Sequence, residues 1–168
     1  MDQISPNVHM VAPADGITVW VLGVLVTMKA MSNETGGTYA LFEDIVPPGV
    51  GPPTHIHTRE EETWYILDGE LQWNVGGKSF QATNGCFIHL PRNVPHSFIN
   101  LSDKNAIMVL TYAPAGYDQW FLEVGQPVAD RYAPGDPPVL SEELEEQAIA
   151  LAKGYGVIFP DLEAKDEL

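Results

Sequence analysis

Alternating apolar and polar positions, interrupted by glycine-rich turns, predict a run of short strands over residues 15–125. Residues 17–28 and 38–46 are rich in aliphatic and aromatic side chains, and Gly36-Gly37 separates them. Further strand candidates are residues 62–67, 71–75, 79–82, 86–90, 97–101 and 106–112. The dipeptides between several of them are Asp68-Gly69, Gly76-Gly77 and Asn84-Gly85, which suit the positive φ angles of tight hairpins. Many short strands with no long helix among them indicate an antiparallel barrel or sandwich.

The pattern changes after Tyr112. Residues 118–125 predict a helical turn whose Trp120 and Phe121 pack on the barrel, and the proline-rich segment 130–138 is typical of a linker. We therefore expect one domain over residues 1–168, with the barrel at about 15–125 and the linker and a C-terminal helix at about 130–168.

The C-terminal helix is predicted over Glu142–Lys153. Ser141 suits an N-cap, and the acidic residues that follow it suit the first turn of a helix. Leu144, Ala148, Leu151 and Ala152 recur at helical spacing, and we expect the helix to pack on the barrel through Leu144, Ala148 and Leu151.

Composition and charge narrow the partners. The 168 residues are 45% hydrophobic and 18% charged, which is an ordinary globular balance. The formal net charge is −15, from 23 acidic and 8 basic residues, and such a surface repels nucleic acid and anionic lipid. We therefore expect neither nucleic acid nor a membrane as a partner. The charge says little about a small-molecule substrate, because a pocket can be lined independently of the surface.

The sequence predicts a cytoplasmic protein. Cys86 is the only cysteine, so no intrachain disulfide can form. Residues 1–16 lack the basic start and apolar run of a signal peptide, and residues 17–28 are too short to span a bilayer. The last four residues, 165–168, spell an endoplasmic-reticulum retention signal, which is read only in the lumen, so we interpret it as fortuitous.

Three histidines and one glutamate form a candidate metal site. His55 and His57 flank one residue, so an extended chain points both imidazoles to one face. Glu62 opens the next strand, and His96 lies about forty residues further on. Such a nitrogen and oxygen donor set suits one divalent transition metal, namely Mn, Fe, Co, Ni, Cu or Zn. Taken separately, a His-x-His pair can be accidental and the acidic run 60–62 can be a solvated edge.

The residues around these four closely resemble the two motifs of the cupin family. The first motif is Gly49, five residues, His55-x-His57, four residues, Glu62, six residues and Gly69. The second is Gly85, five residues, Pro91-x-Asn93, two residues, His96, three residues and Asn100. Asn93 stands where the family usually has Gly, but Asn tolerates positive φ well, so we expect the turn to survive. The six-residue gap to Gly69 also selects Glu62 over Glu61 as the ligand.

Other segments resemble single-domain bacterial quercetin 2,3-dioxygenase-like cupins. These segments are residues 35–39, 49–57, 114–117 and 154–156. The resemblance implies an all-β cupin fold, a double-stranded β-helix or jelly-roll barrel with a short C-terminal helix, assembled as a homodimer. It also implies a metal-dependent dioxygenase that cleaves a flavonol-like or other enolisable or phenolic substrate with O2.

In the mechanism that this resemblance implies, Glu62 is both metal ligand and catalytic base. It takes the hydroxyl proton of the substrate, the enolate binds at the metal, and dioxygen opens the ring with loss of carbon monoxide. Two alternatives stay open. The same site could serve a metal-dependent isomerase, cyclase or lyase, or the chain could be a non-catalytic small-molecule-binding cupin.

The candidate substrate pocket follows from strand parity. Trp64 and Ile66 share parity with Glu62 and should point into the barrel, where Trp64 could form an aromatic wall. Phe98, Met108 and Leu110 are further pocket candidates, although their pattern favours core packing. The remaining residues are given structural roles: His89 is expected to face away from the metal, and Cys86 to behave as a small hydrophobe.

Overall fold

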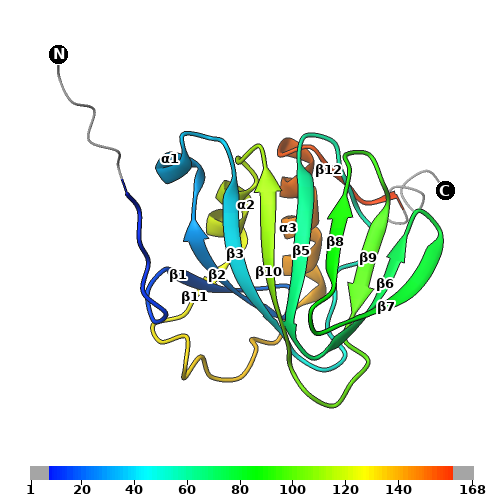
Figure 1. The fold of residues 1–168 in the computed structure, drawn as a ribbon, viewed down its shortest axis with the longest axis horizontal. Coiled ribbons are helices and arrows are strands. Elements are labelled where there is room, and N and C mark those ends of the chain that lie inside the picture. The colour runs from blue at the N-terminus through cyan, green and yellow to red at the C-terminus, as the bar shows by residue number, and fades with distance from the viewer. Residues whose placement is uncertain (1–7, 161–168) are drawn as a thin grey trace.

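The computed structural model describes residues 8–160, which form strands and three helices (Figure 1). The strands are β1 (Ile17–Val21), β2 (Val24–Ala30), β3 (Ala40–Val46), β4 (Ile56–His57), β5 (Glu61–Asp68), β6 (Glu70–Val75), β7 (Lys78–Thr83), β8 (Phe87–Leu90), β9 (His96–Ile99), β10 (Ala106–Ala113), β11 (Gln126–Pro127) and β12 (Val157–Ile158). The helices are α1 (Ser32–Thr35), α2 (Asp118–Val124) and α3 (Glu142–Gly154). The tetrapeptide at 165–168 lies outside the described residues. Within the described part of the chain, every helix is too short and polar to cross a membrane.

The strands form antiparallel sheets. A seven-stranded sheet has the order β11-β1-β2-β3-β10-β5-β8, a three-stranded sheet has the order β7-β6-β9, and β12 pairs with β4. Alternate residues of β3 and β10 are buried, as expected when one face of a sheet packs on a core. The predicted all-β jelly-roll barrel with a short C-terminal helix is confirmed (Figure 1).

The first predicted strand, residues 17–28, is in fact two strands. A turn at Leu22 and Gly23, with φ angles of 47° and 83°, separates β1 from β2. A two-residue turn of this hand matches the twist of the strands that it joins, and Gly adopts it without strain. Both strands are buried along nearly their whole length, so hydrophobicity alone did not reveal the turn.

The helix predicted near the C-terminus is present as α3, but it packs through a different face. The Ser141 side chain accepts a hydrogen bond from Leu144 N at 3.3 Å, as expected for an N-cap. Ala148 is buried as predicted, whereas Leu144 and Leu151 are each 45% exposed. The small Ala148 side chain lets α3 approach α2 closely, and Trp120 Nε1 of α2 donates a hydrogen bond to Ala148 O at 2.9 Å.

The segment after α3 returns to the barrel as β12. Its Val157 pairs with His57, so the C-terminal segment forms a two-stranded antiparallel sheet with β4, the strand that contains His57. Thr58 N donates to Gly156 O at 3.0 Å. Gly156 has a φ of +86°, and a Cβ there would lie 2.8 Å from Arg59 Nε, so this close approach requires glycine.

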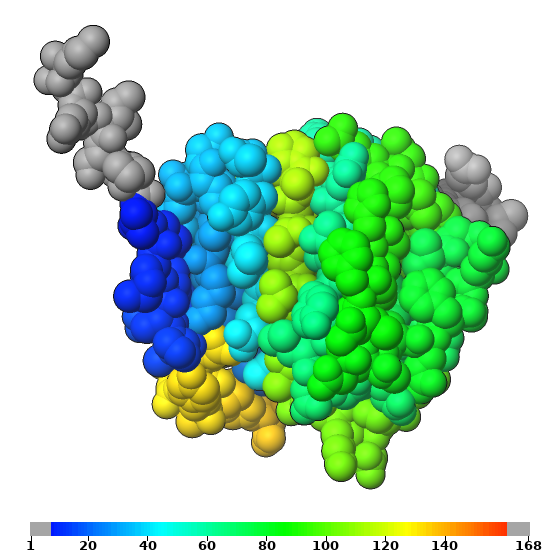
Figure 2. Space-filling view, in the orientation of Figure 1, coloured from blue at the N-terminus to red at the C-terminus, as the bar shows by residue number. Residues whose placement is uncertain are grey.

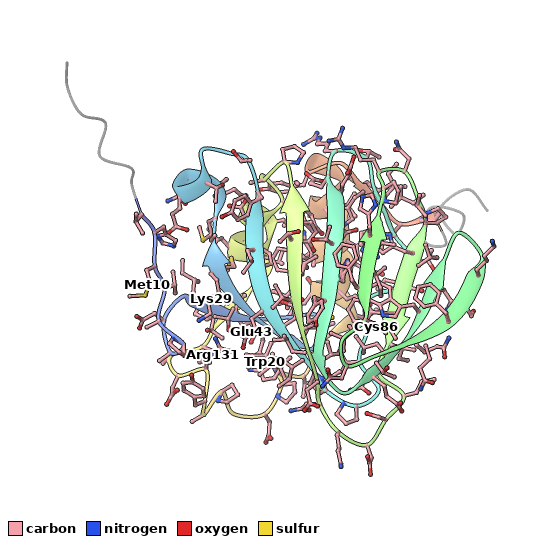
Figure 3. All side chains as sticks on the ribbon, in the orientation of Figure 1. Met10, Trp20, Lys29, Glu43, Cys86 and Arg131 are labelled. Atoms are coloured by element: carbon pink, nitrogen blue, oxygen red, sulfur yellow. The ribbon has the colours of Figure 1, made fainter. Side chains whose placement is uncertain are left out.

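On the opposite side of the barrel, polar side chains fasten the flanking segments to the seven-stranded sheet. Lys29 Nζ donates to three backbone carbonyls in residues 12–15, at 2.6 to 3.1 Å. The Arg131 guanidinium pairs with Glu43. Figure 2 shows the N-terminal segment along this edge, and Figure 3 shows Lys29, Glu43 and Arg131 gathered there, away from Cys86.

Candidate metal centre and adjoining pocket

Four residues from three elements and one loop meet inside the barrel. His57 lies in β4, and His55 is the loop residue that precedes this strand. Glu62 lies in β5 and His96 in β9. One ligand atom from each lies within 4.8 Å of the others, and all four side chains are buried. An isolated antiparallel β-bridge pairs the backbones of His55 and His96. The structure therefore brings together the four residues that the two motifs nominate.

The outer nitrogens of the three imidazoles are held in place. Nδ1 of His55 and Nδ1 of His96 each lie 2.9 Å from the carbonyl oxygen two residues upstream. Because a carbonyl oxygen only accepts, these Nδ1 atoms donate, and in the neutral ring the lone pair is on Nε2. His57 Nδ1 lies 3.3 Å from the buried Glu60 carboxylate. Such outer partners fix the orientation of metal-ligating histidines.

The acidic run 60–62 divides into three environments. Glu60 is buried beside His57, Glu62 is in the cluster, and Glu61 is exposed and lies 3.2 Å from His89. His89 therefore faces away from the cluster, as expected. The role of Glu60 was missed, although the strand parity of an acidic run beside His-x-His was a signal for it.

The inner atoms of the cluster fit a cation. Among the described residues, His57 Nε2, His96 Nε2 and Glu62 Oε1 are fully buried without a hydrogen-bond partner. His96 Nε2 lies 2.9 Å from Glu62 Oε2, and His57 Nε2 lies 3.8 Å from Glu62 Oε1. Buried lone pairs that face one another at these distances repel unless a metal ion or a proton lies between them. Burial lowers the pKa of His96, but the adjacent Glu62 carboxylate outweighs burial and raises it, so this pair attracts a positive charge. Three imidazole nitrogens and one carboxylate suit a divalent transition metal.

Electrostatics place His55 and Glu62 in the protonation states that bind metals. Burial, with the neighbouring His96 and His57, lowers the pKa of His55 to about 3. Burial alone would raise the pKa of Glu62, but the surrounding imidazoles outweigh it and lower this pKa to about 2. A neutral imidazole and an ionised carboxylate are the ligand forms of these side chains.

A largely apolar pocket adjoins the cluster through His55. Its walls are formed by Val21, Leu22, Val24, Val26, Asp44, Pro52, His55, Trp64, Phe98, Tyr112, Tyr117, Trp120, Phe121 and Phe159. Its cavity volume is about 70 Å³, and its empty space is about 570 Å³ when the part open to solvent is counted. The pocket is therefore narrow, although it is larger than a single water requires.

The sequence-predicted pocket residues divide into two groups. Trp64 and Phe98 line the pocket, with their rings 5.4 Å apart. Ile66, Met108 and Leu110 are buried in the core and do not line it. Strand parity correctly predicted that all five side chains face the interior of the barrel. Parity does not predict the position of a residue along the barrel axis, and that position decides whether it lines the pocket.

Sequence reasoning missed three aromatic residues that contact the imidazoles. The Tyr117 and Tyr112 rings lie 4.7 and 5.3 Å from the His57 ring, and Phe159 stacks on His55 at 5.7 Å. Tyr112 continues the inward parity of β10 and Tyr117 lies in a family-like segment, so both had a signal. Phe159 had none, because its position depends on the pairing of β12 with β4.

Comparisons with known proteins agree with this geometry. Residues 42–112 match the family described as "Cupin domain". The chain is 28% identical to quercetin 2,3-dioxygenase of Bacillus subtilis over 66% of its own length and 33% of that protein. It is 30% identical to an uncharacterized protein of Methanocaldococcus jannaschii, over 49% of this chain and 67% of that protein. A predicted oxalate decarboxylase of Thermotoga maritima aligns with a TM-score of 0.58 at 19% identity, covering 62% of this chain and 99% of that one.

These matches carry different weights. The chain spans about a third of the Bacillus subtilis dioxygenase that it matches, and the Thermotoga maritima structure supports the fold alone. The matched region begins within β3 and ends within β10, and it contains all four cluster residues. With its jelly-roll barrel and its buried His/Glu cluster suited to a metal, this chain belongs to the cupin superfamily.

Proposed function

We propose that this protein is a metal-dependent dioxygenase of the quercetinase type, which cleaves a flavonol-like or other enolisable or phenolic substrate with O2. The observation that carries the proposal is the buried cluster of three histidines and one glutamate, whose His55 opens on a pocket lined by aromatic rings. Similarity to quercetin 2,3-dioxygenase supports the choice of reaction.

His55, His57, Glu62 and His96 would hold one divalent metal. When bound, such a metal acts as a Lewis acid that lowers the pKa of a coordinated hydroxyl. Glu62 Oε1 has no hydrogen-bond partner in the described part of the chain, so we assign it to accept the hydroxyl proton of the substrate. His57 and His96 flank this carboxylate, and a metal bound to all three side chains would hold it in place.

The pocket favours a flat, apolar ligand. Trp64, Phe98 and Tyr112 supply ring faces and exclude water from the reacting end. The narrow cavity suits a single aromatic ring at its inner end. Any further rings of a flavonol would then extend toward the opening of the pocket. The negative net charge of the chain does not decide this, because the pocket is lined independently of the surface.

Oxygen consumption tests the proposal. Purified protein is analysed for bound metal and then incubated with quercetin and simpler phenols, aerobically and anaerobically. Substrate-dependent oxygen uptake with release of carbon monoxide supports a quercetinase. Turnover without oxygen would favour an isomerase, cyclase or lyase, and binding without turnover would favour a ligand-binding role. His89→Ala is the matched control, because His89 is exposed and outside the cluster.

The assembly that accompanies this function is proposed to be a homodimer. On the outer face of β5 and β8, Tyr65 pairs across the strands with Phe87, and both side chains are exposed together with Leu67. An exposed apolar patch of this kind is a common feature of subunit interfaces. Sedimentation of wild type and Phe87→Glu tests the assembly: a monomeric wild type would contradict it.

A further inference from the structure

Asp44 is a carboxylic acid inside the apolar barrel. It lies in β3, where alternate residues face the core, between the buried Phe42 and Val46. Its cross-strand neighbours are Val26 of β2 and Met108 of β10, both buried and apolar. Only 4% of Asp44 is exposed. An acid at such a position requires a polar partner or a neutral form.

The described part of the chain gives Asp44 no partner. Its Oδ1 is fully buried without a hydrogen bond. Burial, together with the nearby Glu43 carboxylate, raises the pKa of Asp44 to about 8, and no cation among residues 8–160 lowers it. A neutral carboxyl both donates and accepts hydrogen bonds, so Asp44 offers two polar contacts that the protein leaves unused.

Asp44 and His55 line the same pocket. A second pocket residue, Trp64, has a fully buried Nε1 that also makes no hydrogen bond with any residue from 8 to 160. Buried polar groups without partners are rare in folded proteins, and two in one pocket point to a molecule that supplies the partners. Asp44 does not belong to the cluster of His55, so its partner binds at a separate point of the pocket.

We propose that Asp44 is a specificity-determining residue whose carboxyl hydrogen-bonds an oxygen of the bound ring, at a point distinct from the oxygen that faces the metal cluster. The ligand class is accordingly an aromatic ring with at least two oxygen substituents. The inference rests on the proposed function only in taking this pocket as the ligand site, and it does not require oxygen chemistry.

Phenol and toluene test Asp44 directly, because they differ only in a hydroxyl that replaces a methyl group. Their dissociation constants are measured by tryptophan fluorescence on the full chain as purified with its metal, in wild type, Asp44→Leu and Asp44→Asn. In Asp44→Leu we expect the preference for phenol over toluene to fall about tenfold, as expected for one buried hydrogen bond. Asp44→Asn keeps a hydrogen-bonding group and should retain part of the preference.

The control is Met108→Leu, the cross-strand neighbour of Asp44 that does not line the pocket. It should leave the preference unchanged, because it conserves volume and polarity. An equal preference in wild type and Asp44→Leu would overturn the inference, and would mean that the metal or only a buried water interacts with the hydroxyl. Failure of both probes to bind wild type would overturn it as well. The oxygen-uptake screen judges the proposed reaction separately, so the two failures are distinguishable.

Discussion

Two buried carboxyls in the same barrel have opposite surroundings. Glu62 is 1% exposed and lies among three imidazoles, whereas Asp44 is 4% exposed and lies among apolar side chains. Imidazoles lower the pKa of Glu62 to about 2 against the effect of burial, and burial raises that of Asp44 to about 8. Burial is common to both, so the neighbours alone decide which acid carries a charge.

The difference divides the interior by chemistry. The metal end is built for charge, because its ionised carboxylate faces nitrogen lone pairs that require a cation. The Asp44 end is built for neutral hydrogen bonding, because no cation among residues 8–160 affects the Asp44 carboxyl. Two acids whose pKa values are driven apart inside one barrel are a pattern typical of sites with separate roles for each acid.

The largest effect should follow from removing one imidazole. His55→Ala, His57→Ala or His96→Ala each deletes one of four ligands and should lower metal affinity by more than the roughly 10–100-fold that outer partners contribute. The barrel should stay folded, because its core is made elsewhere. Metal content by mass spectrometry and circular dichroism check both points. Full metal occupancy in His96→Ala would remove His96 from the ligand set.

Removing the tail should damage the metal end next. Deletion of the residues after Pro138 removes β12, which pairs with β4, and Phe159, which stacks on His55. Loss of buried aromatic and aliphatic contacts should cost about 4 kcal/mol or more and lower Tm. Leu144→Ala, at a 45% exposed position, should lose far less. Equal melting curves for the full and shortened chains would show that the tail does not close the barrel.

The sequence predicted the metal end far better than the Asp44 end. His55, His57, Glu62 and His96 lie in two motifs of fixed spacing, and the structure brings these four residues together, so local pattern and three-dimensional position agree. Asn93 illustrates the same point, because it adopts the positive φ of 65° expected where the family has Gly.

The rest depended on contacts that no local pattern encodes. Asp44 has inward parity in β3, but parity does not show that β2 and β10 surround it with apolar residues. Phe159 reaches His55 through strand pairing across about a hundred residues. Leu144 and Leu151 were predicted to pack because they are apolar, yet Ile149 and Ala152 are the buried residues beside Ala148.

Glu62→Gln should lower kcat by about 10²-fold or more per bound metal, because it removes the group assigned to accept the substrate proton. Affinity should change much less, since the lost interaction belongs to the transition state. The measurement uses fully metal-loaded protein and the substrate found by the oxygen screen. Asp44→Asn is the comparison, and should raise KM more than it lowers kcat. Near wild-type kcat in loaded Glu62→Gln would leave Glu62 as a ligand only.

The smallest expected effect is on how the free energy of unfolding changes with pH, and it reports on Asp44 alone. Its folded pKa is raised from 3.8 to about 8, so the native state retains a proton that the unfolded state has lost. Its contribution to stability is therefore complete below about pH 4 and is lost progressively as the pH rises toward 8. Between pH 5 and 7, wild type should lose up to about 1.4 kcal/mol per pH unit relative to Asp44→Asn, which cannot titrate.

Other groups of the pocket do not titrate in this window. Burial raises the pKa values of Tyr112 and Tyr117 well above 10, and His55 has its pKa near 3. Asp118→Asn is the control, because hydrogen bonds from Ser32 and its other neighbours outweigh burial and lower the pKa of Asp118. The contribution of Asp118 to stability therefore changes with pH only below about pH 4. Between pH 5 and 7, the free energy of unfolding of Asp118→Asn, measured with urea, should change with pH as it does in wild type. If the free energy of unfolding of Asp44→Asn also changes with pH as in wild type, Asp44 is ionised in the folded protein and the contrast with Glu62 fails.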